Sequence, residues 1–375
     1  MYTYQSLQDV LFLMLYGGVA MLAFVAAFYL LFRRNNAFSV DIITPKALRK
    51  WTAAFFIIAA LSHCWWFALG VYWLTDDRMV RNITAVTLDH IMLVPLVMAM
   101  LLRMLQDRHH RLWPWFLAQV PTAMIAVVGI TMPNVDTLDI IHYWQVTVIA
   151  TFVVYYVYVL LRYGRWLRDN YADLEHKEVW QSLLFVVVLF IIYEIYSTNP
   201  GVMSREYIAQ YNTIFIVAFL LWRVETLQEL EVKEDVSTPY IQEELLPSEP
   251  QDSENADGIT PLSSNIGLLL QKYCVESKLY LQHDLTLTQL SEKLGTNRTY
   301  LSQYFSQQDI TYNLYVNRLR IDHFERLYRE AIVSGRFFTA QQLAHDSGFR
   351  SYSTFAAAFK QFMGQTVTEW MRQQN

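Results

Sequence analysis

Residues 286–306, TLTQLSEKLGTNRTYLSQYFS, have the pattern of two short helices joined by a tight turn. Leucines recur at helical spacing in the first half, which gives that helix one apolar face. Gly295 can form the turn, and Asn297 can cap the next helix, because its side chain accepts a hydrogen bond from a free backbone N–H. Leu301 and Phe305 stand at i and i+4 and anchor the second helix. The stretch therefore predicts a helix-turn-helix.

Polar side chains remain on the outer face of this second helix. They are Arg298, Thr299, Ser302 and Gln303, and with the capping Asn297 they form the first group of candidate DNA-binding residues. Their hydroxyl, amide and guanidinium groups are suited to hydrogen bonds with base edges and phosphate oxygens. We expect this helix to contact DNA.

The same pattern recurs at residues 339–360, TAQQLAHDSGFRSYSTFAAAFK. Gly348 takes the turn position, and Phe355 and Phe359 anchor the second helix at the spacing seen in the first unit. Between the two units, residues 312–331 form a long helical pattern that would hold them at a fixed separation. The chain therefore predicts two helix-turn-helix units in tandem.

Four runs in this region are similar to those of the AraC/XylS-type transcription regulators. They are YLQHDLTLTQLSEKLGTNRTYLSQYF, YVNRLRI, LAHDSGF and FAAAFKQFMGQTVTEW, within about residues 280–372. The resemblance implies that each unit places its second helix in the major groove of double-stranded DNA. By the same likeness, Thr299 and Gln303 are candidates for reading bases in the first unit.

The resemblance also implies roles for residues of the second unit. The candidates at the start of its recognition helix are Arg350, Ser351, Tyr352 and Ser353, and Lys360 is a phosphate candidate. Two alanines within this helix replace polar groups, so we expect the second unit to read fewer bases and to depend more on phosphate contacts.

The remainder of the chain has the composition of a membrane protein. The sequence is 54% hydrophobic and 17% charged, and about 25% charged residues is typical of soluble domains. Seven apolar runs are long enough to cross roughly 30 Å of hydrocarbon. They are residues 11–32, 51–75, 84–105, 112–132, 140–162, 179–198 and 207–223.

Basic residues alternate between the loops that join these runs. The first, third and fifth loops hold Arg33, Arg34, Lys46, Arg49, Lys50, Arg103, Arg108, Arg111, Arg162, Arg165, Arg168 and Lys177. The other loops hold only Arg78, Arg81 and Arg205. Because cytoplasmic loops carry the excess of Lys and Arg, this asymmetry predicts an outside N-terminus. Seven crossings then place the C-terminal domain in the cytoplasm.

Several ionisable and polar side chains fall inside the apolar runs. They are His63, Asp89, His90, His142, Glu194 and Asn212. Such groups are costly in a membrane unless they are paired or wetted, so they usually face the interior of a bundle. Two interpretations stay open, a ligand or signalling pocket and a buried structural network between helices.

The composition changes abruptly after the last apolar run. Residues 231–262 are rich in acidic residues, proline and serine, which predicts a disordered tether between residues 1–230 and 263–375. A flexible tether transmits no torque, so a signal would have to change the oligomeric state, the local concentration, or what the tether itself binds. The C-terminal segment is only slightly basic by residue count. We therefore expect DNA affinity to depend either on dimerisation, as a homodimer, or on help from the membrane-bound array.

The predicted fold is all-α, a polytopic seven-helix transmembrane bundle followed by a cytoplasmic double helix-turn-helix domain. The predicted function is that of a one-component transcription regulator in the bacterial inner membrane. Its expected partners are double-stranded DNA, membrane lipid and a small-molecule or membrane signal.

Two other classes stay in view for the whole chain. One is a transporter or enzyme with an appended regulatory domain, and the other is a membrane scaffold that uses its helical domain for protein interaction. The sequence lacks the H-E-x-x-H, G-x-S-x-G and glycine-rich phosphate motifs, so we expect no enzyme activity, catalytic residue, metal or cofactor. Two cysteines, Cys64 and Cys274, exclude a disulfide framework.

Overall fold

A computed structural model describes residues 7–33, 35–38, 42–70, 75–132, 136–197, 203–230 and 261–374. All regular elements in these ranges are helical, as predicted. The chain divides into two compact units. The first contains Met1–Tyr163 and His176–Val232, and the second contains Gly164–Glu175 and Lys233–Asn375. The predicted tether spans residues 231–262. Residues 231–260 lie outside the described ranges, and the last two residues of the tether begin the next helix.

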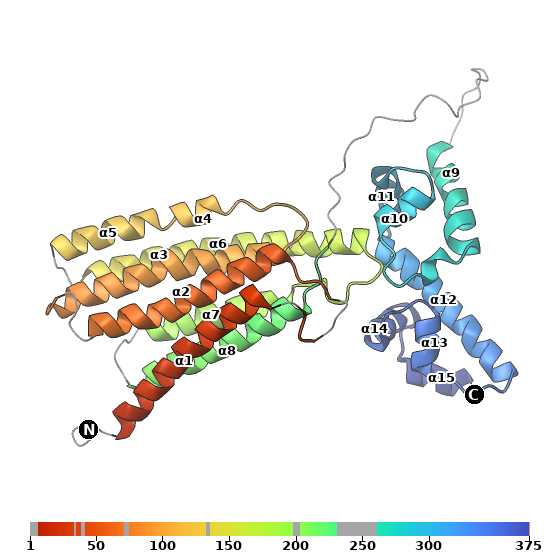
Figure 1. Cartoon of the computed structure of the whole chain (residues 1–375). Coiled ribbons are helices and arrows are strands. Elements are labelled where there is room, and N and C mark those ends of the chain that lie inside the picture. The colour runs from red at the N-terminus through yellow and green to blue at the C-terminus, as the bar shows by residue number, and fades with distance from the viewer. Residues whose placement is uncertain are drawn as a thin grey trace, which may run out of the picture. The chain divides into compact units, whose positions relative to one another are not determined.

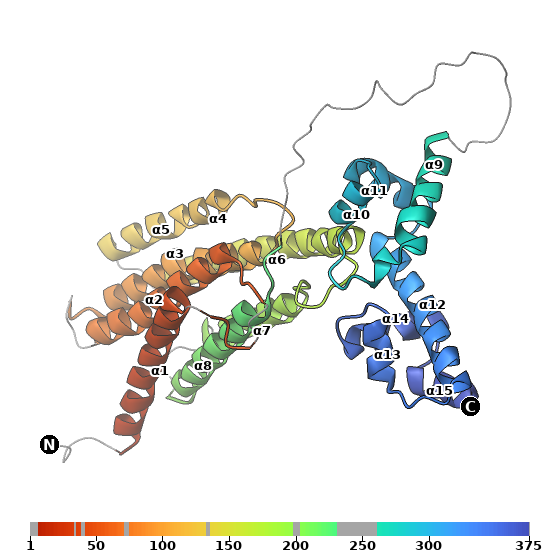
Figure 2. The same ribbon diagram turned by 45° about the vertical axis from the view of Figure 1, so that its right-hand side comes forward.

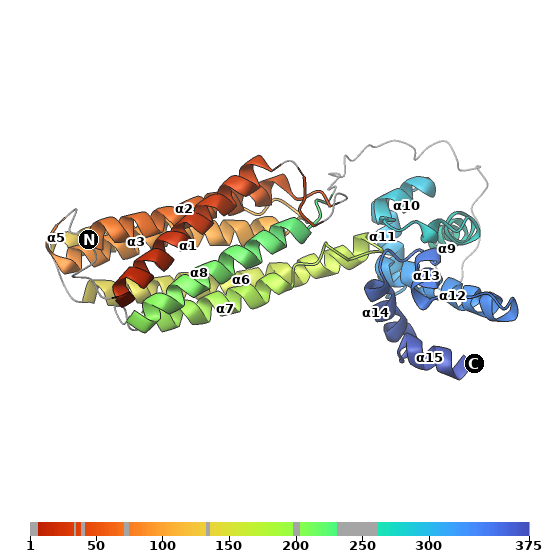
Figure 3. The same ribbon diagram turned by 60° about the horizontal axis from the view of Figure 1, so that its bottom comes forward.

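The first unit is built from long apolar helices. They are α1 (Leu7–Phe32), α2 (Lys46–Gly70), α3 (Arg78–Met104), α4 (Trp113–Leu117), α5 (Val120–Thr131), α6 (Asp136–Asn170), α7 (Gln181–Ser197) and α8 (Met203–Thr226). Helix α1 packs on α2 and α8, α2 packs on α3, and α3 packs on α5. Figures 1 and 3 show these helices side by side as a bundle. The last residues of α6, from Gly164 onward, belong to the second unit.

Six helical segments in the described residues are long and apolar enough to cross a membrane, and α4 and α5 together count as one of them. The prediction of seven is wrong by one. Helix α7 has 17 residues, so at about 1.5 Å per residue it falls short of the roughly 30 Å of a hydrocarbon core. The run at 179–198 is longer than the helix, because α7 begins at Gln181 and ends at Ser197.

The outer surface of this bundle is apolar. Large hydrophobic side chains on three different helices are well exposed, among them Met14 on α1, Val127 on α5 and Val154 on α6. A soluble monomer rarely exposes apolar surface on this scale, whereas a surface that faces lipid must be apolar. The exposure pattern agrees with the length and composition of the six segments.

The second unit is arranged along one long helix. Its elements are α9 (Pro261–Leu270), a π-helical turn (Gln271–Glu276), a short 3₁₀ turn (Leu279–Leu281), α10 (Leu287–Lys293), α11 (Arg298–Gln307), α12 (Tyr312–Val333), α13 (Ala340–Asp346), α14 (Tyr352–Met363) and α15 (Val367–Gln374). Figure 2 shows α9, α10 and α11 at one end of α12, and α13, α14 and α15 at the other. The predicted spacer at 312–331 is therefore a single continuous helix.

Each end of α12 contributes to a separate hydrophobic core. Val316 lies in the core of α10 and α11 with Leu301 and Phe305. Phe324, two turns further along, lies in the core of α13, α14 and α15. Because one rigid helix enters both cores, it fixes the separation of the two helix-turn-helix units.

Candidate nucleic-acid interface

The first helix-turn-helix unit has the local structure that its sequence predicts. Helix α10 begins with a capping box in which Thr286 and Gln289 each satisfy a backbone N–H of the other. Gly295 makes the turn with φ of +65°, a conformation that favours glycine. Asn297 caps α11 by accepting a hydrogen bond from the Thr299 backbone N–H at 2.8 Å. The start of the recognition helix is therefore held in place by local bonds.

Burial separates the anchoring residues of α11 from the candidate contact residues. Leu301 and Phe305 are buried in the core, as predicted. Thr299 and Gln303 are exposed on the opposite face, and Ser302 is half-buried. The helix thus presents a hydroxyl and an amide to solvent while its apolar face fixes its orientation.

The second helix-turn-helix unit follows the same plan as the first, with a different polar surface. Ser351 caps α14 through a hydrogen bond from the Thr354 backbone N–H at 3.3 Å. Tyr352 and Ser353 are exposed in the first turn, and Lys360 is exposed in the last turn. The Arg350 guanidinium forms an ion pair with Asp284 at 3.4 Å. This unit presents hydroxyls and cations at the ends of its recognition helix.

A close approach of two backbones explains the turn glycine of the second unit. Gly348 has φ of +91°, and a Cβ atom there would lie 2.8 Å from the Leu281 Cα. No other residue type fits without moving the 3₁₀ turn. The second helix-turn-helix unit is therefore packed directly against the 3₁₀ turn that precedes the first helix-turn-helix unit.

Arg320 on α12 is a structural residue that the sequence analysis missed. Its guanidinium is fully buried and donates hydrogen bonds to the backbone carbonyls of Tyr280 and Gln282 at 2.8 and 2.7 Å. Burial lowers the pKa of this arginine, and the carbonyl bonds offset the cost of burying its charge. An arginine on the apolar side of a predicted helix was the available signal.

One short stretch of the second compact unit makes further contacts that were not predicted. It contains Asn170, the last residue of α6, and Glu175. The Asn170 side-chain oxygen accepts hydrogen bonds from the Arg298 guanidinium at 2.6 and 3.0 Å. Arg298 is thus already engaged within the chain. The contact joins residues far apart in the sequence, and no local pattern indicates it.

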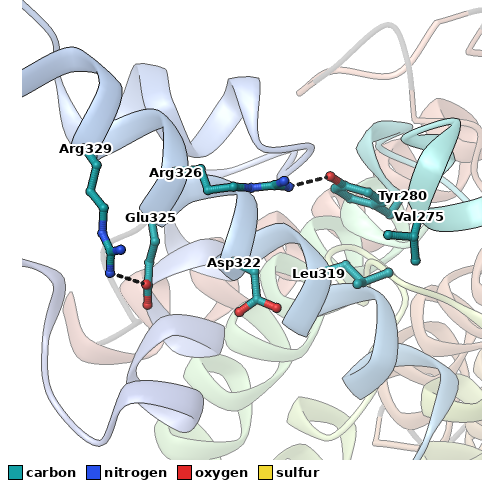
Figure 4. Close-up of a pocket in the computed structure, with 7 residues that line it drawn as sticks. All are labelled: Val275, Tyr280, Leu319, Asp322, Glu325, Arg326 and Arg329. Atoms are coloured by element: carbon teal, nitrogen blue, oxygen red, sulfur yellow. Dashed lines mark hydrogen bonds and ion pairs between the residues drawn. The ribbon is translucent and has the colours of Figure 1, made fainter. Parts of the chain in front are cut away.

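A cavity of about 360 Å³ lies beside α12 in the second unit. Figure 4 shows its lining residues Val275, Tyr280, Leu319, Asp322, Glu325, Arg326 and Arg329. Arg326 donates to the Tyr280 hydroxyl at 3.1 Å, and Arg329 pairs with Glu325 at 3.4 Å. Several of its charged groups therefore already have partners in the wall of the cavity.

The candidate signalling residues whose side chains are described lie on α2, α3, α6 and α8. The Asp89 carboxylate on α3 accepts hydrogen bonds from Ser62, Trp65 and Trp66 on α2 at 2.6, 3.1 and 2.7 Å. His63 lies 2.8 Å from the Ala59 carbonyl through Nδ1. These contacts tie α2 to α3 through a carboxylate with three donors.

A second polar contact joins α2 to α8. The Nε2 atom of His63 lies 3.0 Å from the Gln210 side-chain oxygen. His90 on α3 is buried, and His142 on α6 and Asn212 on α8 are half-buried. Glu194 belongs to α7, and its side chain lies outside the described part of the structure. Asp89 and His63 are thus in helix-to-helix networks, while the predicted grouping of Asp89 with Glu194 stays a prediction.

The described residues include side-chain types that can ligate metals, and the thiol of Cys274. Within those ranges, no group of three His, Cys, Asp or Glu side chains is placed to hold a metal ion. Cys274 is buried, and burial raises the pKa of its thiol to about 12. A thiol that stays protonated is a poor nucleophile and a poor redox sensor.

Comparison with known proteins supports the interpretation of the second unit. A family model described as a helix-turn-helix domain matches residues 290–373. Uncharacterized HTH-type transcriptional regulators of Staphylococcus aureus strains COL and MSSA476 are each 27% identical over 104 residues. The match covers 27% of this chain and 13% of each relative's length. No solved structure matches the chain.

These matches agree with the two capped units described above. Residues 290–373 form a helix-turn-helix domain of the AraC type, and the relatives that share it are transcriptional regulators. The matched residues exclude the six long apolar segments, which all precede residue 227. The family evidence therefore concerns the second unit alone.

Proposed function

We propose that this chain is a membrane-embedded one-component transcription regulator that binds double-stranded DNA sequence-specifically. One observation carries the proposal. A tandem helix-turn-helix domain with exposed polar side chains on its recognition helices shares a chain with six long apolar helical segments. The matched relatives, which are named as transcriptional regulators, support a non-enzymatic role.

The geometry suggests how DNA would be bound. Helices α11 and α14 would enter successive stretches of the major groove on one face of the duplex, with α12 fixing their separation. Thr299 and Gln303 would contact base edges, and a good bidentate contact contributes about 1–3 kcal/mol of discrimination. Ser351, Ser353 and Lys360 would contact mainly phosphates, which position the domain without reading sequence.

The location of the two ends follows from separate arguments. We place the C-terminal domain in the cytoplasm of a bacterial cell, because DNA is there. The basic residues of the first, third and fifth loops favour an N-terminus on the outside. Six full crossings would put both ends on one side, so an outside N-terminus together with a cytoplasmic C-terminal domain requires an odd number of crossings.

The signal would act on the first compact unit, which contains the long apolar helices. Buried polar groups such as Asp89 and His63 link α2, α3 and α8, so a lipid or small-molecule ligand that favoured one packing of these helices would shift its population. The domain is only weakly basic, and we propose that a homodimer supplies the additional DNA contacts.

The direct test is selection of random double-stranded DNA by the full chain in lipid nanodiscs. We expect one sequence to be enriched, and Gln303→Ala to relax the preference at one base position. Ser306→Ala on the same helix is the matched control, because that residue is exposed but stands outside the candidate set. Failure of the wild-type chain to enrich any sequence would contradict the proposal.

A further inference from the structure

A short stretch at the end of α6 is built into the helix-turn-helix domain. Tyr171 pairs with Thr286 in an isolated antiparallel β-bridge. The Ala172 backbone N–H donates to the Leu285 carbonyl at 3.3 Å. The Asn313 side-chain amide donates to the Ala172 carbonyl at 2.6 Å. The backbone of this stretch is therefore held by both α12 and the loop before α10.

Burial shows that the contact is a packed one. Ala172 is fully buried and belongs to the same hydrophobic core as Leu285, Leu301 and Phe305. Asp173 is also buried, and its charge acts on Arg320. A loose surface contact would leave Ala172 and Asp173 exposed to water. Residues 170–175 therefore fit a defined docking surface on the helix-turn-helix domain.

The same residues engage the starts of both recognition helices. Asn170 accepts hydrogen bonds from Arg298, the first residue of α11. The Thr354 hydroxyl in the first turn of α14 donates to the Glu175 carboxylate at 3.5 Å. These are the helix ends that would approach DNA, because N-terminal residues of a recognition helix contact base edges.

Charge makes the overlap with DNA more severe. Asn170 and Glu175 offer oxygen acceptors to Arg298 and Thr354, as phosphate oxygens of DNA would. The carboxylate of Glu175, held beside the first turn of α14, would also repel a phosphate that approached there. The DNA backbone and residues 170–175 therefore compete for the same hydrogen-bond donors, Arg298 and Thr354.

We propose that residues 170–175 form an intramolecular docking segment that competes with DNA for the starts of α11 and α14. The inference rests on the proposed function and adds its regulation. The segment continues α6, and the earlier part of α6 belongs to the first compact unit. A movement of α6 would therefore release residues 170–175 from the helix-turn-helix domain or return them to it. This route is direct and does not pass through residues 231–262.

The first test compares the DNA affinity of full-length variants in nanodiscs. Asn170→Ala with Glu175→Ala should tighten binding by about tenfold, because hydrogen bonds that involve charged groups contribute on that order. Asp169→Ala is the matched control, since that carboxylate interacts with Arg165 and Arg168 of its own helix. Equal or weaker binding by the double variant would overturn the proposal.

The second test locks the segment in place. Paired residues of an antiparallel bridge lie at Cα distances of about 4.5–5.5 Å, within the range that a disulfide spans. Tyr171→Cys with Thr286→Cys, in a Cys64→Ser background, should lose DNA binding at least tenfold on oxidation and regain it on reduction. Each single cysteine variant controls for the loss of its own side chain.

The outcomes separate this inference from the proposed function. Specific DNA binding that is equal in the wild type, the double alanine variant and the oxidised chain overturns the docking segment and leaves the regulator intact. Absence of specific binding in every variant, including the released one, overturns the regulator and the docking segment together.

Discussion

The two helix-turn-helix units share one scaffold and differ in what they present to DNA. Both begin their recognition helices with a side-chain cap and anchor them with two buried apolar residues. The first exposes Thr299 and Gln303, whereas the second exposes Ala357 in the corresponding stretch. The comparison teaches that folding and reading are set by opposite faces of one helix, so units can fold alike and read differently.

The largest expected effect concerns the shared scaffold. Phe355→Ala in α14 should lower the free energy of unfolding of the second unit by about 3–5 kcal/mol, because its ring is fully buried among aromatic residues. Amide hydrogen exchange of α12 to α15 in the full chain, followed through urea unfolding, would measure the loss. Tyr352→Ala, exposed on the same helix, should cost far less. Equal losses would show that α14 is not anchored as described.

An effect of intermediate size concerns base reading. Gln303→Ala in the first unit should reduce discrimination at one base pair by about 1–3 kcal/mol. Ser353→Ala in the second unit should change discrimination less, because we assign that residue to phosphates. Binding to a library of single-base variants of the selected site measures both. A larger loss of discrimination for Ser353→Ala would reverse the comparison between the units.

A smaller effect concerns phosphate contacts. Lys360→Ala should weaken binding to all sequences alike, since an exposed lysine at the end of α14 would contact the DNA backbone. The slope of log affinity against log salt should become shallower by about 0.9, the value for one phosphate contact. A changed base preference with an unchanged salt slope would assign Lys360 to base reading instead.

The smallest effect on DNA binding concerns the first compact unit, the bundle of long apolar helices. Asp89→Asn should alter reporter output per molecule in cells if its contacts with Ser62, Trp65 and Trp66 set the packing of α2 and α3. A purely structural role predicts lower abundance with output per molecule preserved. Membrane abundance measured alongside reporter output separates the two, and His90→Ala and Glu194→Gln extend the test to the other candidate signalling residues.

Local signals explain why so much of the second unit could be predicted from the sequence. Asn297, Gly295 and the anchor pair Leu301 and Phe305 lie within a few residues of one another, and each acts on its own turn or helix. Caps, positive φ and apolar spacing depend on neighbours in the chain. The predicted cap, turn and anchors of the first helix-turn-helix unit are confirmed.

The differences between prediction and structure come from effects that hydropathy or local pattern does not contain. The run at 179–198 includes residues before Gln181, where α7 begins, so apolar composition overstated the helix length. The docking of Ala172 depends on a backbone bridge to residues more than a hundred positions away. Likewise, the hydrogen bonds from Trp65 and Trp66 to Asp89 depend on the packing of α2 against α3, which local sequence does not encode.

Orientation is testable without any DNA. Reporter fusions that work only in the cytoplasm should be active after Arg108 and Arg168 and inactive after Asp77, because the basic loops are expected inside. A fusion after Gln374 tests the cytoplasmic placement of the second unit separately. Activity after Asp77 would refute the loop-charge argument, and inactivity after Gln374 would refute the proposed regulator.

The central claim is that both helix-turn-helix units of the membrane-held chain contact one DNA site. Hydroxyl-radical footprinting of the full chain in nanodiscs, on the selected DNA, tests this most directly. The account predicts two protected segments on one face of the duplex, about 10 base pairs apart, because α12 holds the recognition helices at a fixed separation. A single protected segment, or protection without a preferred sequence, would contradict it.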